Sequence, residues 1–192
     1  MSLVHFITHP DVVIDPAVPV PDWPLSERGR ARMAAALGAP WVSGICAVHC
    51  STEQKAIDGA AMLAGHLGLP FATHADLGEN DRSATGYLPR AEFEATADLF
   101  FAHPTESIRG WERAVDAQAR IVAAVDRLLA VPPVGDLAIV AHGGVGALLL
   151  ADLSGAAISR RFDQPGQGGG HWFAFDPVAW VVTQGWRDIA AG

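Results

Sequence analysis

The sequence predicts a three-layer α/β/α fold, with helices on both faces of a doubly wound, mostly parallel mixed sheet. Strand and helix patterns alternate along the chain, which favours such a sheet. The chain has 192 residues, of which 50% are hydrophobic, so it can bury a sizeable core. Only 18% are charged, which argues against a disordered chain.

The first strand and helix frame a proline-rich loop. Residues 3–7 are rich in β-branched and aromatic side chains, which suit a strand. Pro10 has no backbone N–H to donate, so strand pairing should end near His9. After the loop, residues 25–38 read as a helix with Ser26 as its N-cap.

The second strand is predicted over residues 44–50 and feeds directly into a helix over 51–68. This helix opens on a capping-box pattern, Ser51 with Gln54 three residues later. We therefore expect a strand-to-helix turn at Ser51.

The rest of the chain completes a single domain over 1–192. A less regular stretch and two helical patterns form a helical excursion at about 75–130. Residues 136–155 then repeat strand, turn and helix, and residues 171–176 and 180–186 read as two closing strands joined by a turn.

Charge and hydropathy limit the classes of partner. The formal net charge of −8 argues against binding to nucleic acid or to an anionic membrane surface, and favours small molecules or proteins as partners. No apolar run approaches the roughly 20 residues of a spanning helix. The N-terminus lacks a basic leader and a cleavage site, so we expect a cytoplasmic protein. The sequence is compatible with a homo-oligomer.

Candidate functional residues follow the predicted strands. Open α/β sheets bind ligands at the carboxyl ends of their strands, and His9, Ser51 and His142 each stand at such an end. Gly143, next to His142, would let a ligand approach the backbone closely, although glycine is also common in turns that bind no ligand.

At these positions the sequence resembles the histidine phosphatase superfamily, which includes phosphoglycerate mutases and many phosphomonoesterases. The order and spacing of several motifs carry the resemblance. "FITHPDV" resembles the family's strand ending in Arg-His-Gly, "VHCSTEQKA" its Ser-Ser-Pro-x-x-Arg-Ala stretch, "LGEND" its Leu-x-Glu segment and "IVAHGGV" its second histidine motif. "WPLSERGRARM" and "PTESIRGWERAVDAQARI" are similar to the helices that begin with Leu-Thr-x-x-Gly and Gly-Glu-Ser.

The resemblance implies a phosphoglycerate mutase-like fold and a phosphomonoester hydrolase that forms a phosphohistidine intermediate on a small phosphorylated substrate. It assigns His9 as the phosphoryl acceptor, His142 as the second histidine, Lys55 as a phosphate ligand and Glu79 as the proton donor. Phosphoryl transfer to histidine needs a neutral imidazole, donors for the phosphoryl oxygens and an acid for the leaving alkoxide. It requires no metal and no cofactor.

The departures from the family pattern affect the phosphate site. Thr8 replaces an arginine, Lys55 replaces a second arginine, and Asp15 falls where the family often has a phosphate-binding asparagine. These changes predict a loss of about two charge units and a transition state weakened by several kcal/mol. Arg82, three residues after Glu79, is expected to restore part of the charge.

Other readings remain open at this point. The chain could be a catalytically silent relative that binds a ligand or partner, or an enzyme of this fold that acts on a less charged substrate. A mutase fits less well, because it needs a strong grip on phosphate. His5, His49 and His171 lack the spacing of a metal site, so none is expected.

Overall fold

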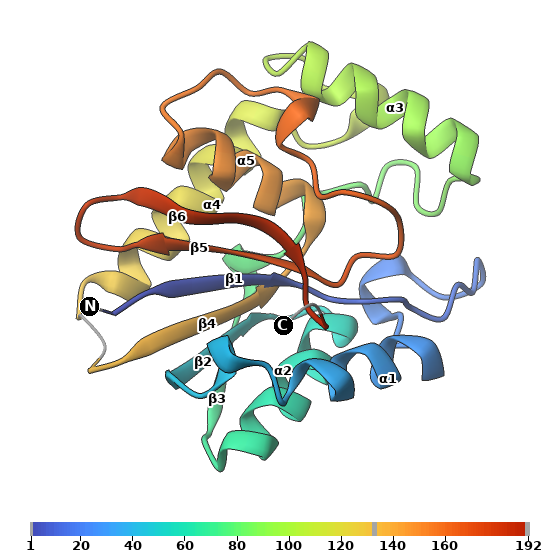
Figure 1. The fold of residues 1–192 in the computed structure, drawn as a ribbon. Coiled ribbons are helices and arrows are strands. Elements are labelled where there is room, and N and C mark those ends of the chain that lie inside the picture. Colours follow the sequence, from blue (N-terminus) through green and yellow to red (C-terminus); the bar gives the residue numbers. More distant parts are fainter. Residues whose placement is uncertain (1, 132–133, 191–192) are drawn as a thin grey trace.

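The computed structural model describes residues 2–131 and 134–190. Its strands span Val4–Thr8 (β1), Ile45–Ser51 (β2), Phe71–His74 (β3), Asp136–Ala141 (β4), His171–Asp176 (β5) and Val181–Asp188 (β6). They form one sheet in the order β3-β2-β4-β1-β5-β6 (Figure 1). The pairs from β3 to β1 are parallel, and β5 pairs antiparallel with both β1 and β6. The sheet is therefore mixed and mostly parallel, as predicted.

Helices cover both faces of this sheet (Figure 1). Helices α1 (Glu27–Ala36) and α2 (Gln54–Leu67) pack on one face, and α4 (Ala114–Leu129) and α5 (Gly143–Leu153) pack on the other. Helix α3 (Arg90–Ala102) lies outside these layers and packs against α5. None of the described helices is long and apolar enough to cross a membrane. Short 3₁₀ turns occupy Val20–Asp22, Pro40–Val42, Ala75–Leu77, Ile108–Gly110 and Arg160–Phe162.

The central strand β1 is buried along its whole length. Its side chains alternate, because successive residues of a strand point to opposite faces. Phe6 packs with Ile139 in the core beneath α4 and α5, and Ile7 packs with Val140 in the core beneath α1 and α2. Both faces of the strand are thus fixed by packing, and the residue that follows β1 is held in place.

The local predictions at the helix starts had different outcomes. Ser26 caps α1 as predicted, since its hydroxyl accepts a hydrogen bond from the Gly29 N–H at 3.1 Å. The capping box at Ser51 and Gln54 is wrong, because Ser51 is the last residue of β2 and α2 begins only at Gln54. Strand β3 was not predicted; it has four residues, all but the last of them exposed.

Candidate active site

Two histidines meet where two neighbouring parallel strands end. His9 follows β1 and His142 follows β4, and the His9 N–H donates to the Ala141 carbonyl at 3.1 Å. The two imidazole rings lie edge to face with centroids 5.2 Å apart. This confirms that both side chains reach one pocket at the carboxyl edge of the sheet.

The His9 imidazole is set up as a neutral base. Its Nδ1 donates to the Pro10 carbonyl at 2.9 Å, so the lone pair of the neutral ring is on Nε2. Burial lowers the pKa of His9 to about 3, with further lowering by His142 and Lys55. The ring is therefore unprotonated at neutral pH and can act as a nucleophile.

His142 has one ring nitrogen engaged and one without a partner. Its Nε2 lies 2.8 Å from the Ser51 hydroxyl and 3.3 Å from Oε1 of Glu53. Among the described residues nothing bonds to its Nδ1, although that atom is buried. Burial also lowers the pKa of His142.

Glu53 is a member of the site that sequence reasoning missed. Its Oε2 accepts a hydrogen bond from the Lys55 ammonium at 2.5 Å, and its Oε1 accepts one from the Glu79 N–H at 2.9 Å. Burial alone would raise the pKa of Glu53, but His142 and Lys55 lower it to about 2. The carboxylate therefore contacts both groups that would receive phosphoryl oxygens, the Lys55 ammonium and the His142 ring.

Lys55, predicted as a phosphate ligand, does line the pocket, but two of its three N–H donors are engaged within the protein. Besides Glu53, its ammonium donates to the Val20 carbonyl at 2.8 Å, and its side chain is only 5% exposed. A phosphate would therefore have to share this ammonium with a resident carboxylate.

Glu79 is held at the N-terminus of α5. Its carboxylate accepts hydrogen bonds from the Gly144 and Val145 N–H groups, both at 3.0 Å, and lies 3.2 Å from the Arg82 guanidinium. Burial opposes its charge, but Arg82, His142 and the Gly144 N–H together lower its pKa. In this state Glu79 is a carboxylate, and a role as proton donor requires that a ligand raise its pKa.

Arg82, the other predicted cation, also lines the pocket. Its guanidinium lies 4.9 Å from the ring centroids of both Phe93 and Trp111, and its Nε donates to Oδ1 of Asn80 at 2.9 Å. Because Oδ1 faces Arg82, the other end of the Asn80 amide is Nδ2, a buried donor with no partner in the described structure.

The glycines after His142 allow close packing by protein groups. A Cβ on Gly144 would lie 2.6 Å from Oε1 of Glu79, and one on Gly143 would lie 2.3 Å from the Gln164 amide nitrogen. Only a bare backbone leaves Glu79 room to bond to the start of α5. At Gly143 the group that lies close to the backbone is thus the Gln164 side chain and not a ligand.

Two predicted substrate ligands do not face the pocket. Thr8 is fully buried, where its hydroxyl accepts from the His171 N–H at 2.9 Å and donates to Gln164 Oε1 at 2.6 Å. Asp15 is exposed in the proline-rich loop, where its carboxylate accepts from the Ala17 N–H. The reason in each case is local: Thr8 bridges β1 to the chain before β5, and Asp15 forms a turn.

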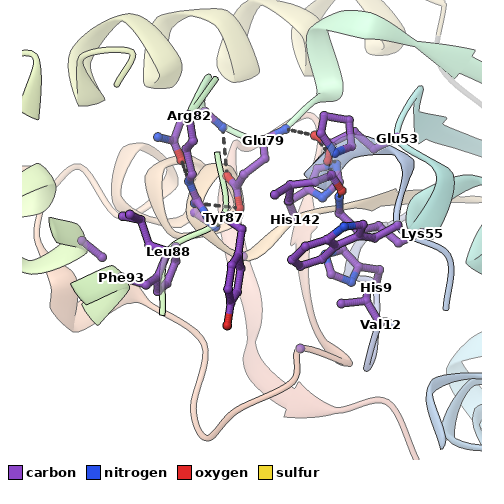
Figure 2. Close-up of a pocket in the computed structure, with 18 of the residues that line it drawn as sticks. His9, Val12, Glu53, Lys55, Glu79, Arg82, Tyr87, Leu88, Phe93 and His142 are labelled. Atoms are coloured by element: carbon purple, nitrogen blue, oxygen red, sulfur yellow. Dashed lines mark hydrogen bonds and ion pairs between the residues drawn. The ribbon is translucent and has the colours of Figure 1, made fainter. Parts of the chain in front are cut away.

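The pocket as a whole is a cleft of about 1150 Å³. His9, His142, Glu53 and Lys55 gather on one side of it, and Arg82, Leu88 and Phe93 lie on the other, with Tyr87 between them (Figure 2). Each of the two cations predicted to bind phosphate is paired with a carboxylate, Lys55 with Glu53 and Arg82 with Glu79. Within 2–131 and 134–190, no three metal-ligating side chains cluster in a way that could hold an ion.

Solved structures share this fold. A mycobacterial glucosyl-3-phosphoglycerate phosphatase is 24% identical, with 97% of this chain and 96% of that one covered and a TM-score of 0.75. The alpha-ribazole phosphatase of Shigella flexneri is 19% identical, with 99% and 98% covered and a TM-score of 0.72. Bacillus stearothermophilus YhfR is 18% identical, with 96% and 95% covered and a TM-score of 0.76. A search of curated proteins found no significant match.

Fold and site define an α/β protein with a two-histidine centre at the carboxyl edge of its sheet. The chain belongs to the histidine phosphatase superfamily, since the sequence model of that family (branch 1) matches residues 17–184. The matched stretch contains Glu79 and His142 and begins after His9. The assignment of His9 therefore depends on its position beside His142.

Proposed function

We propose that this protein hydrolyses phosphomonoesters through a phosphohistidine formed at His9, with a phosphate site weakened by Glu53. The observation that supports it most strongly is the His9 ring. It is neutral, has its lone pair on Nε2 and lies with its centroid 5.2 Å from that of His142. A nucleophile of this kind is what phosphoryl transfer to histidine requires.

In the first step the His9 Nε2 attacks phosphorus, the P–O bond to the alcohol breaks, and Glu79 gives the alkoxide a proton. The approach of a phosphoryl dianion raises the pKa of Glu79 above its lowered resting value, since like charges disfavour each other. In the second step water attacks the phosphohistidine and returns a proton to Glu79. Inorganic phosphate leaves, and His9 is neutral again.

The phosphoryl oxygens would be received by the Lys55 ammonium and by the His142 ring. We propose that Nε2 of His142 carries the ring proton, because the Ser51 oxygen lies 2.8 Å and the Glu53 carboxylate 3.3 Å from it. A phosphate that displaces the Glu53 carboxylate would then accept a hydrogen bond from this N–H.

A second candidate is an enzyme of this fold that acts on a less charged group. The observation in its favour is the pairing of Lys55 with Glu53 and of Arg82 with Glu79, which leaves the base of the cleft close to neutral. A cleft floor without net charge attracts a phosphate dianion only weakly. In this case His9 would still be the nucleophile.

The two candidates are separated by steady-state assays of the full chain on phenyl phosphate and on neutral phenyl esters. We expect phosphate release that falls by at least ~10³-fold in His9→Ala. His66→Ala, which changes an exposed histidine on α2, serves as the matched control and should keep wild-type activity. Hydrolysis of the neutral esters alone, dependent on His9, would favour the second candidate.

A further inference from the structure

The cleft beside His9 has a second side that the proposed chemistry does not use. It is apolar and largely aromatic, and its wall is built from the loop before α3, from α3 itself and from Trp111. Tyr87, Leu88, Phe93 and Trp111 form this wall, and Ile14 and Trp23 line the cleft from the proline-rich loop.

Part of this apolar surface is open to water. Tyr87 is 38% exposed and Ile14 is 59% exposed, although both line the cleft. The Tyr87 ring lies 5.7 Å from that of Trp23, so the two loops meet through aromatic rings. Large exposed apolar side chains that line a concave site are typical of a place where a ligand is buried.

The indole N–H groups and the Arg82 guanidinium on this side of the cleft are engaged within the protein. The Trp111 indole N–H donates to the Thr85 hydroxyl at 2.8 Å, and the Trp23 indole N–H donates to the carbonyls of Asp15 and Val18. Arg82 is held between Phe93 and Trp111 and bonds to Glu79. Trp23, Phe93 and Trp111 therefore offer a ligand apolar contact. The Asn80 amide and the Tyr87 hydroxyl also line the cleft and can bond to polar groups.

The cleft is also larger than a phosphate needs. Its volume of about 1150 Å³ exceeds the roughly 300–1,000 Å³ of a pocket for a drug-sized ligand. Tyr87 stands between the His9 side and the Leu88 and Phe93 side (Figure 2). A ligand whose head group reaches His9 would therefore place its body along the Tyr87 ring.

We propose that the substrate is the phosphate monoester of a large apolar alcohol, one with a ring or a chain of several methylene groups, and not of a sugar or a glycerate. This inference rests on the phosphatase function proposed above for the phosphoryl head. The specificity comes from the apolar wall, which is independent of the charges at Glu53 and Lys55.

The test uses n-alkylphosphonates from ethyl to octyl, which have no ester bond to hydrolyse, and measures their Kd for the full chain by calorimetry. We expect each added methylene to lower Kd by about threefold to fourfold until the wall is covered. Tyr87→Ala should weaken octylphosphonate by on the order of fivefold and leave ethylphosphonate unchanged. Phe71→Ala is the matched control, since Phe71 is 37% exposed on β3 and lies outside the cleft.

The corresponding alkyl phosphates are then assayed for turnover, because primary alkoxides are similar leaving groups. We expect kcat/KM to rise with chain length in parallel with the affinity, and octyl phosphate to exceed a hexose phosphate by at least ~10-fold. A Kd that does not change with chain length would overturn the apolar specificity, even if His9-dependent hydrolysis is observed. Phosphonates that bind more tightly with length, together with no hydrolysis of any ester, would support the apolar site and contradict the phosphatase function.

Discussion

Glu53→Gln is the substitution that most directly alters the proposed phosphate site. The carboxylate lies 2.5 Å from the Lys55 ammonium and 3.3 Å from the His142 ring, the two groups assigned to the phosphoryl oxygens. A phosphate that contacts the same two groups would come within ~5 Å of Glu53. At an effective dielectric constant of about 20, this repulsion is on the order of 3 kcal/mol per unit of phosphate charge.

The amide removes the charge but has one oxygen and one NH2 group, so it can accept a hydrogen bond from Lys55 or from the Glu79 N–H but not from both. Allowing for side-chain relaxation, we expect the Kd of inorganic phosphate to fall by about 10- to 100-fold. Calorimetry at pH 7.5 measures this Kd, and thermal melting checks that the variant is folded. Glu106→Gln makes the same change of charge on a side chain that is 66% exposed, and should leave Kd unaltered. If the folded Glu53→Gln protein binds phosphate with unchanged or weaker affinity, Glu53 does not compete with phosphate for Lys55 and His142.

Five further perturbations test other assignments. Glu79→Gln should lower turnover of alkyl phosphates by ~10² or more and spare activated aryl phosphates, and equal losses would show that Glu79 is not the donor. Ser51→Ala should reduce kcat by about tenfold, and nitrogen NMR should show a changed environment at Nε2 of His142, which loses one of its two partners. Thr8→Arg should lower the melting temperature instead of raising activity, because Thr8 is fully buried, whereas Asp15→Asn should leave the phosphate Kd unchanged. Burial lowers the pKa of His9 from 6.5 to about 3, so between these pH values the imidazole is protonated in the unfolded chain but not in the folded one. The free energy of unfolding should therefore decrease as the pH falls below 6.5. Urea unfolding should show a shallower decrease in His9→Ala.

The sheet and its ligand-binding edge could be predicted because their signals are local. The apolar run before His9 and its following proline mark the end of β1, and both faces of that strand are buried. Parallel neighbours end at the same edge, so placing His9 and His142 together needed only the alternation of strands and helices. Strand β3 carries no such signal, since four residues at a sheet edge with little burial form no hydrophobic pattern.

The predicted charges of the pocket were less reliable because the direction of a side chain is a tertiary property. Asp15 was assigned by its position in a motif, yet it bonds within its own turn. The negative charge beside Lys55 comes from Glu53, which the sequence presents as an ordinary residue at a helix start. Its role emerges only when β2, α2 and the Glu79 loop are packed together.

Trapping of the covalent intermediate tests the central claim most directly. The full chain is mixed with octyl phosphate or phenyl phosphate, quenched in base within milliseconds to seconds, and digested for mass spectrometry under conditions that preserve phosphohistidine. We expect one added phosphoryl group on the peptide that contains His9, absent in His9→Ala and lost once the ester has been consumed. Two results would contradict phosphoryl transfer to His9. One is turnover of these esters with no phosphoryl group on His9, and the other is undiminished turnover by His9→Ala.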